Sequence, residues 1–115
     1  MKSIKELYRI GTGPSSSHTM GPRKAAEMFL TRHPEAASFK VTLYGSLAAT
    51  GKGHMTDVAI IDTLKPTAPV DIIWQPKIFL PFHPNGMNFV ALDAGGNELE
   101  NWTVYSVGGG ALAED

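Results

Sequence analysis

The spacing of hydrophobic and polar residues predicts helices at the start of the chain. Apolar side chains recur at helical intervals over residues 3–9 and again over 17–32, with a Gly/Pro break between the two stretches. Pro22 fits the first turn of the second helix, where a missing N–H costs little. The dipeptide His33-Pro34 should end that helix.

The middle of the chain predicts one strand and two further helices. Residues 39–44 alternate between apolar and polar and are rich in β-branched and aromatic side chains, which is typical of a strand. Residues 46–50 predict a short helix that ends at Gly51. After a turn at 52–53, residues 55–63 predict another helix.

Strand patterns dominate the second half of the chain. The candidate strands are 70–74, 77–80, 88–93 and 98–107, and residues 94–97 carry the Gly/Asn composition of a hairpin turn. Helices first and hairpins later predict an α+β domain with a mostly antiparallel sheet and three to four helices.

Composition and charge narrow the possible functions. The chain has 115 residues, the size of one domain, and its hydrophobic share of 43% is ordinary for a globular protein. A formal net charge of −1 lacks the basic excess of nucleic-acid binders. No apolar run is long enough to cross a bilayer, and the first residues lack a secretory signal. We therefore expect a cytoplasmic protein that binds neither nucleic acid nor membrane.

The absence of cysteine limits the cofactors that this chain can hold. Without cysteine there are no disulfides and no thiolate ligands for a metal. Four histidines without cysteine or paired carboxylates do not form a metal signature. We therefore expect no metal site within the chain itself.

A serine-rich segment, Gly13-Pro-Ser-Ser-Ser-His-Thr19, stands directly before the second predicted helix. Free N–H groups and the positive dipole end at a helix start favour an anion, and the neighbouring hydroxyls add donors. The segment therefore suits a carboxylate or phosphate, and His18 adds a charged hydrogen bond or a proton-transfer group. The alternative is a polar loop in which one serine caps the helix.

A second polar segment, the Gly-Lys-Gly-His segment, spans residues 45–57. Five residues separate Gly45 from Gly51, whereas a phosphate-binding P-loop has four, so a nucleotide-binding loop is disfavoured. His54 follows a tight turn and begins a helix, a position suited to a general acid or base that Asp57 could orient. The alternative is a turn histidine beside a carboxylate that favours the helix dipole. Ser106, beside a triple glycine, is a weaker candidate for a ligand contact.

Three stretches of the chain together resemble one protein family. Residues 3–26 and 43–57, which contain the two polar segments, resemble the signatures of the β chain or β domain of iron–sulfur-dependent L-serine dehydratases. The ending Tyr105-Ser-Val-Gly-Gly-Gly110 also fits this family. The resemblance covers nearly all of 1–115 and implies a single β domain of a larger enzyme, or one of two chains. Since that domain is similar to the allosteric substrate-binding domain of some phosphoglycerate dehydrogenases, the same fold is expected.

The resemblance implies an L-serine ammonia-lyase, a lyase of amino-acid catabolism that yields pyruvate. L-serine loses its β-hydroxyl as water, and the enamine hydrolyses to pyruvate and ammonia. A [4Fe–4S] cluster with an open iron acts as a Lewis acid on that hydroxyl, and the α domain of the family holds the cluster through cysteines. The expected partners are therefore L-serine and a cysteine-bearing α domain or chain, in an oligomer, and the isolated chain should be inactive.

The resemblance also implies roles for individual residues. The residues that would face the substrate, chiefly its carboxylate, are Ser15, Ser16, Ser17, His18 and Thr19. His54 would be the catalytic acid or base, and the substrate-binding residues that shape its turn would be Lys52, Gly53 and Asp57.

Two other functions stay open on the sequence. The first is a non-catalytic regulatory domain that binds serine or a related carboxylate and controls an attached enzyme. The second is a structural dimerisation domain, which has no need of hydroxyl groups at helix starts. Binding of serine by the isolated chain would favour the regulatory domain, and exposed apolar surface without ligand dependence would favour the structural one.

Overall fold

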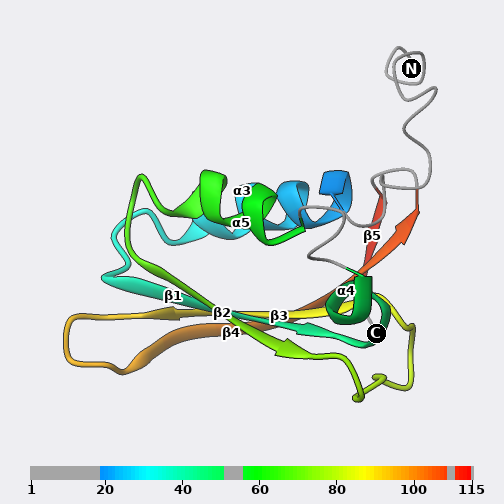
Figure 1. Cartoon of the computed structure of the whole chain (residues 1–115). Coiled ribbons are helices and arrows are strands. Elements are labelled where there is room, and N and C mark those ends of the chain that lie inside the picture. Colours follow the sequence, from blue (N-terminus) through cyan, green and yellow to red (C-terminus); the bar gives the residue numbers. More distant parts are fainter. Residues whose placement is uncertain (1–18, 51–55, 109–110, 115) are drawn as a thin grey trace, which may run out of the picture.

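The computed structural model describes residues 19–50, 56–108 and 111–114, and they form two layers (Figure 1). One layer is a five-stranded sheet in the order β2-β1-β3-β4-β5, and the other is a pair of helices, α3 and α5, on one face of that sheet. The elements in chain order are α3 (Gly21–Arg32), β1 (Ser38–Tyr44), α4 (Gly45–Thr50), α5 (Thr56–Leu64), β2 (Val70–Gln75), β3 (Gly86–Leu92), β4 (Glu98–Gly108) and β5 (Ala111–Ala113).

The sheet is mixed. Strand β1 pairs with β2 in parallel, while the pairs β1–β3, β3–β4 and β4–β5 are antiparallel. A parallel pair needs a long crossover connection, and here α4 and α5 provide it. The predicted α+β class is confirmed. The expected total of three to four helices stays a prediction, because the helix predicted at 3–9 lies outside the described residues.

The core lies between the sheet and the two helices. Strand alternation turns one apolar row of each central strand toward the helices, as with Phe39, Val41 and Leu43 in β1, which are at most 1% exposed. Phe29 of α3 reaches this row and stacks on Trp102 of β4, with ring centroids 6.0 Å apart. Burial of these aromatic and aliphatic side chains is the main stabilising term of the fold.

The hairpin predicted at 94–97 is confirmed and joins β3 to β4. The carboxylate of Asp93 accepts hydrogen bonds from the backbone N–H groups of Gly95 and Asn97, both at 2.9 Å. The bond from Asn97 in particular holds the pKa of Asp93 below its ordinary value. Gly96 has φ +85°, a conformation that favours glycine and completes the turn.

The strand predicted at 77–80 is wrong. Residues 76–77 form a turn and 78–80 have no regular structure, with Phe79 58% exposed. Prolines stand at both ends of this stretch, at Pro76 and Pro81, and proline cannot donate a ladder hydrogen bond. Strand β5, by contrast, was not predicted, because its three residues carry no alternation and are held by pairing with β4.

Helix α3 is held tightly against β4 at its start. A Cβ atom added at Gly21 would lie 2.1 Å from Ser106 Oγ and 2.9 Å from Ser106 Cβ, well inside van der Waals contact. Glycine is therefore required at position 21 for steric reasons, and the helix cannot approach the sheet in this way with any larger residue.

The end of α3 is also fixed to β4. His33 terminates the helix, and its Nε2–H donates to a carboxylate oxygen of Glu100 at 2.5 Å. Arg32 donates two hydrogen bonds to the same carboxylate, at 3.1 and 3.2 Å. Partial burial raises the pKa of Glu100, but the hydrogen bonds from His33 and Arg32 and the charge of Arg32 outweigh it, so the pKa lies below its ordinary value.

Replacing Gly21→Ala should lower the free energy of unfolding by about 1–3 kcal/mol because the new methyl group collides with Ser106. Adding Ser106→Gly should restore part of that loss, since it removes both atoms that the methyl group meets. Urea unfolding of the two single variants and the double variant measures the coupling. Lys24→Ala, on the exposed side of α3, is the control and should change stability by less than about 0.5 kcal/mol. Additive effects of the two substitutions would contradict the steric explanation.

Replacing Glu100→Gln should lower stability at neutral pH by up to about 1 kcal/mol, a small value because Arg32 and Glu100 are partly solvated. A depressed pKa in the folded state contributes stability above the ordinary value of 4.5, and that contribution is lost as pH falls through the folded-state pKa. The difference between wild type and variant should therefore shrink in urea unfolding at about pH 3. Glu98→Gln, exposed on the same strand, is the control. A difference that grows toward acid pH would refute the assignment.

Candidate functional site

Strand directions define one end of the molecule where the candidate segments meet. Strands β1 and β4 both run antiparallel to β3, and β2 runs parallel to β1, so β1, β2 and β4 all end on one side. We call this side the carboxyl end of the sheet. Helices α3 and α5 both begin there and run side by side away from it, from right to left in Figure 1.

The serine-rich segment leads into α3 at this end. Thr19 is its one described residue; it is half-buried and lies with Met20 in a π-helical turn that continues into α3. Met20, directly before α3, has helical backbone angles and makes no side-chain capping bond, and Pro22 occupies the first turn as predicted. The residues of this segment outside the described ranges are Ser15, Ser16, Ser17 and His18.

The Gly-Lys-Gly-His segment begins at the same end. Gly45 directly follows β1 with φ +50°, and a Cβ there would lie 2.7 Å from both the Phe79 ring and the Pro84 carbonyl oxygen. Only glycine allows the strand to turn into α4 at this point. At the other end of the segment, Thr56 is buried and Asp57 is half-buried in the first turn of α5.

The described ends of the two polar segments therefore lie at one end of the sheet. Thr19 precedes α3, Asp57 opens α5, and both helices begin at the carboxyl end of the sheet. The turn residues Lys52 and Gly53 and the imidazole of His54 lie outside the described residues, so their contacts with Thr19 or Asp57 stay predictions.

The loop between β2 and β3 also reaches this end and was underestimated on the sequence. Asn85 fixes the end of β4 from two sides: its carbonyl oxygen accepts from Ser106 N–H at 3.0 Å, and its Nδ2 donates to the Ser106 carbonyl oxygen at 3.1 Å. The backbone N–H of Asn85 donates to His83 Nδ1 at 3.1 Å. The Asn85-Gly86 dipeptide had suggested turn chemistry alone, and no sequence signal links it to Ser106.

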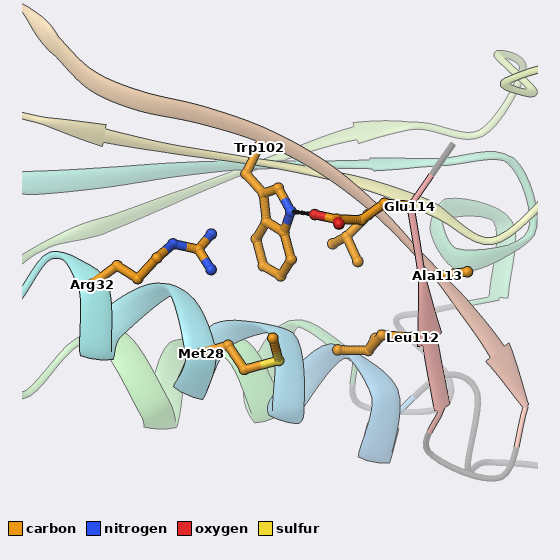
Figure 2. Close-up of a pocket in the computed structure, with 7 residues that line it drawn as sticks. Met28, Arg32, Trp102, Leu112, Ala113 and Glu114 are labelled. Atoms are coloured by element: carbon orange, nitrogen blue, oxygen red, sulfur yellow. Dashed lines mark hydrogen bonds between the residues drawn. The ribbon is translucent and has the colours of Figure 1, made fainter.

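An open pocket of about 260 Å³ lies between α3 and strands β4 and β5 (Figure 2). The guanidinium of Arg32 lies 4.5 Å from the centre of the Trp102 ring, and the indole N–H donates to the carboxylate of Glu114. Since Arg32 is also paired with Glu100, the charged groups here already have protein partners. The other lining residues are Met28, Val104, Leu112 and Ala113. No predicted site residue lines this pocket.

No metal site is found among the described residues: they contain no cluster of three or more histidine, cysteine or acidic side chains. The whole sequence lacks cysteine, so the chain has no thiolate to ligate an iron–sulfur cluster. The donor set therefore does not fit such a cluster within this chain. Across the same described residues, no helix is both long enough and apolar enough to cross a bilayer.

Comparison with known proteins gives a consistent result. The family model for the serine dehydratase beta chain matches residues 3–72 and 62–115. The chain is 35% identical to an L-serine dehydratase of Streptomyces coelicolor over 98% of its length, and 34% identical to one of Haemophilus influenzae over its whole length. It is 36% identical to L-serine dehydratase TdcG of Escherichia coli, again over the whole chain.

The chain spans about a third of the length of these relatives, 34% in each case. The alignment with the Haemophilus influenzae protein extends over 155 positions although the chain has 115 residues, a difference of about 40 positions without a counterpart here. The two matched stretches of the family model meet at residues 62–72. We infer that the missing segment falls at the connection from α5 to β2, at the end of the sheet opposite the candidate site.

Both the family model and the relatives match along essentially the entire chain, including both polar segments. The chain therefore belongs to the serine dehydratase beta chain family.

Proposed function

We propose that this chain is the β part of an L-serine dehydratase, which converts L-serine to pyruvate and ammonia. The observation that carries the proposal is that the two polar segments begin and end at one end of the sheet, in a chain that matches L-serine dehydratases along its whole length. Two segments far apart in the sequence thus have access to one substrate.

In this proposal the serine-rich segment binds the substrate carboxylate. The hydroxyls of Ser15, Ser16, Ser17 and Thr19 and the imidazole of His18 supply hydrogen-bond donors. The start of the following helical segment adds backbone N–H groups and a positive dipole end. Half-burial of Thr19 supports this role because donors shielded from water hold an anion more strongly than solvated ones.

His54 is the proposed acid or base for the elimination, which removes a proton from Cα and the hydroxyl from Cβ as water. A histidine at the turn before α5 has a pKa in the range needed to move a proton at neutral pH. Lys52 and Gly53 shape that turn, and the carboxylate of Asp57, half-buried three residues later, selects the imidazole tautomer by accepting one ring N–H.

The complete enzyme requires a second part. The absence of cysteine supports a [4Fe–4S] cluster held by a cysteine-bearing α domain or chain, and this chain has no residues to bind it. The cluster would supply Lewis-acid chemistry at the substrate hydroxyl. The site is then shared, and the isolated β part has no activity of its own.

The variant His54→Ala, in the complete enzyme assembled anaerobically with its α part, should reduce kcat/KM for L-serine by on the order of 10²- to 10⁴-fold. Pyruvate formation from L-serine measures the effect, and the thermal midpoint should stay within a few degrees of wild type. His33→Gln is the control: it changes a histidine at the opposite end of α3, and its turnover should match wild type well below its melting temperature. Unchanged turnover in His54→Ala would remove this residue from the mechanism.

The regulatory alternative is separated by a binding measurement. Calorimetric titration of the isolated chain with L-serine should show little or no heat if the site is completed by the α part. Clear saturable binding by the isolated chain, together with an assembled enzyme that makes no pyruvate, would contradict the catalytic proposal and favour a sensor.

A further inference from the structure

The hydroxyl of Ser106 is a buried polar group that needs a partner. Ser106 has 0% exposure, and its Oγ is the buried side-chain polar atom without a hydrogen bond among the residues that the structure describes. Leaving a buried hydroxyl unsatisfied costs about 1–3 kcal/mol. A cost of this size calls for a compensating contact, because nearly all buried polar groups in folded proteins are paired.

The direction of this side chain is fixed by its backbone. The N–H and carbonyl groups of Ser106 both bond to Asn85, and across the other edge Ser106 pairs with Leu112 of β5. Strand alternation places Trp102, Val104 and Ser106 on the face covered by the helices. The hydroxyl therefore projects from the sheet toward α3.

At that point the hydroxyl meets the first residue of α3. The 2.1 Å between Ser106 Oγ and the position of a Cβ on Gly21 puts the two groups in direct contact. Residues 13–19 enter the helix immediately before this contact. A donor without a partner is thus aimed at the place where the serine-rich segment meets α3.

Steric fit alone does not account for a serine at position 106. Alanine would leave the same backbone hydrogen bonds and the same strand pairing, and it would remove the unsatisfied atom. The two preceding residues on this face, Trp102 and Val104, are apolar. The hydroxyl therefore indicates a polar ligand rather than a packing requirement.

We propose that Ser106 is a further substrate-binding residue, whose Oγ–H donates a hydrogen bond to the carboxylate of the amino acid bound at the start of α3. This inference rests on the function proposed above and extends the site to the end of β4. Since Ser106 is fully covered, the groups over its hydroxyl must shift when the ligand binds.

The test is Ser106→Ala in the complete enzyme. Loss of a hydrogen bond to a charged carboxylate should raise KM for L-serine on the order of 10- to 100-fold, with a much smaller change in kcat, because the bond holds substrate and transition state alike. The thermal midpoint should be unchanged or higher, since an unsatisfied buried group has been removed.

Thr103→Ala is the matched control. It removes a hydroxyl from the same strand, on the opposite face of the sheet, where Thr103 Oγ1 accepts from Asn88 Nδ2 at 3.0 Å. This variant should lower the thermal midpoint slightly and leave KM unchanged. The opposite pattern for Ser106→Ala, an unchanged KM with a lowered midpoint, would give the hydroxyl a structural role and overturn the proposal.

The outcomes separate the two proposals. Wild-type turnover of L-serine with an unaffected KM in Ser106→Ala refutes the role of Ser106 alone. No turnover by the assembled wild type refutes the enzymatic function and this inference with it. If Ser106→Ala fails to fold, Ser106→Gly repeats the test, and failure of both variants to fold counts against a ligand role.

Discussion

The contact between the start of α3 and the end of β4 is the constraint on which the arrangement of the candidate site depends. Gly21 and Ser106 approach so closely that no methyl group fits between them. At the other end of the same helix, Arg32 and His33 hold Glu100 of β4 through three hydrogen bonds. Because both ends of α3 are fixed on one strand, the segment before the helix is delivered to the end of the sheet where β1 and β4 finish.

This geometry explains how one short domain can contribute two distant polar segments to one substrate. The parallel pairing of β1 and β2 requires a crossover, and the crossover contains the Gly-Lys-Gly-His segment. Its second helix must begin at the carboxyl end of the sheet in order to return to the start of β2. The segment that relatives have and this chain lacks falls at the opposite end, where α5 joins β2. The loss of that segment therefore leaves the site end of the fold unchanged.

Local sequence patterns predicted most of the regular structure because alternation and helical spacing record which side chains are buried. The row Phe39, Val41 and Leu43 identified β1 in this way. Residues 77–80 misled because their β-rich composition reflects apolar packing of a proline-bounded loop on Gly45. Sequence also marked Ser106 as a polar residue beside glycines, but its burial depends on α3, more than eighty positions earlier in the chain. No local pattern carries that information.

The most direct test of this account is a crystal structure of the complete enzyme with L-serine, or an unreactive carboxylate analogue, bound. The account predicts one carboxylate oxygen within about 3 Å of Ser106 Oγ, at the start of α3. A ligand whose carboxylate is held elsewhere, with the Ser106 hydroxyl bonded to a protein group instead, would contradict it.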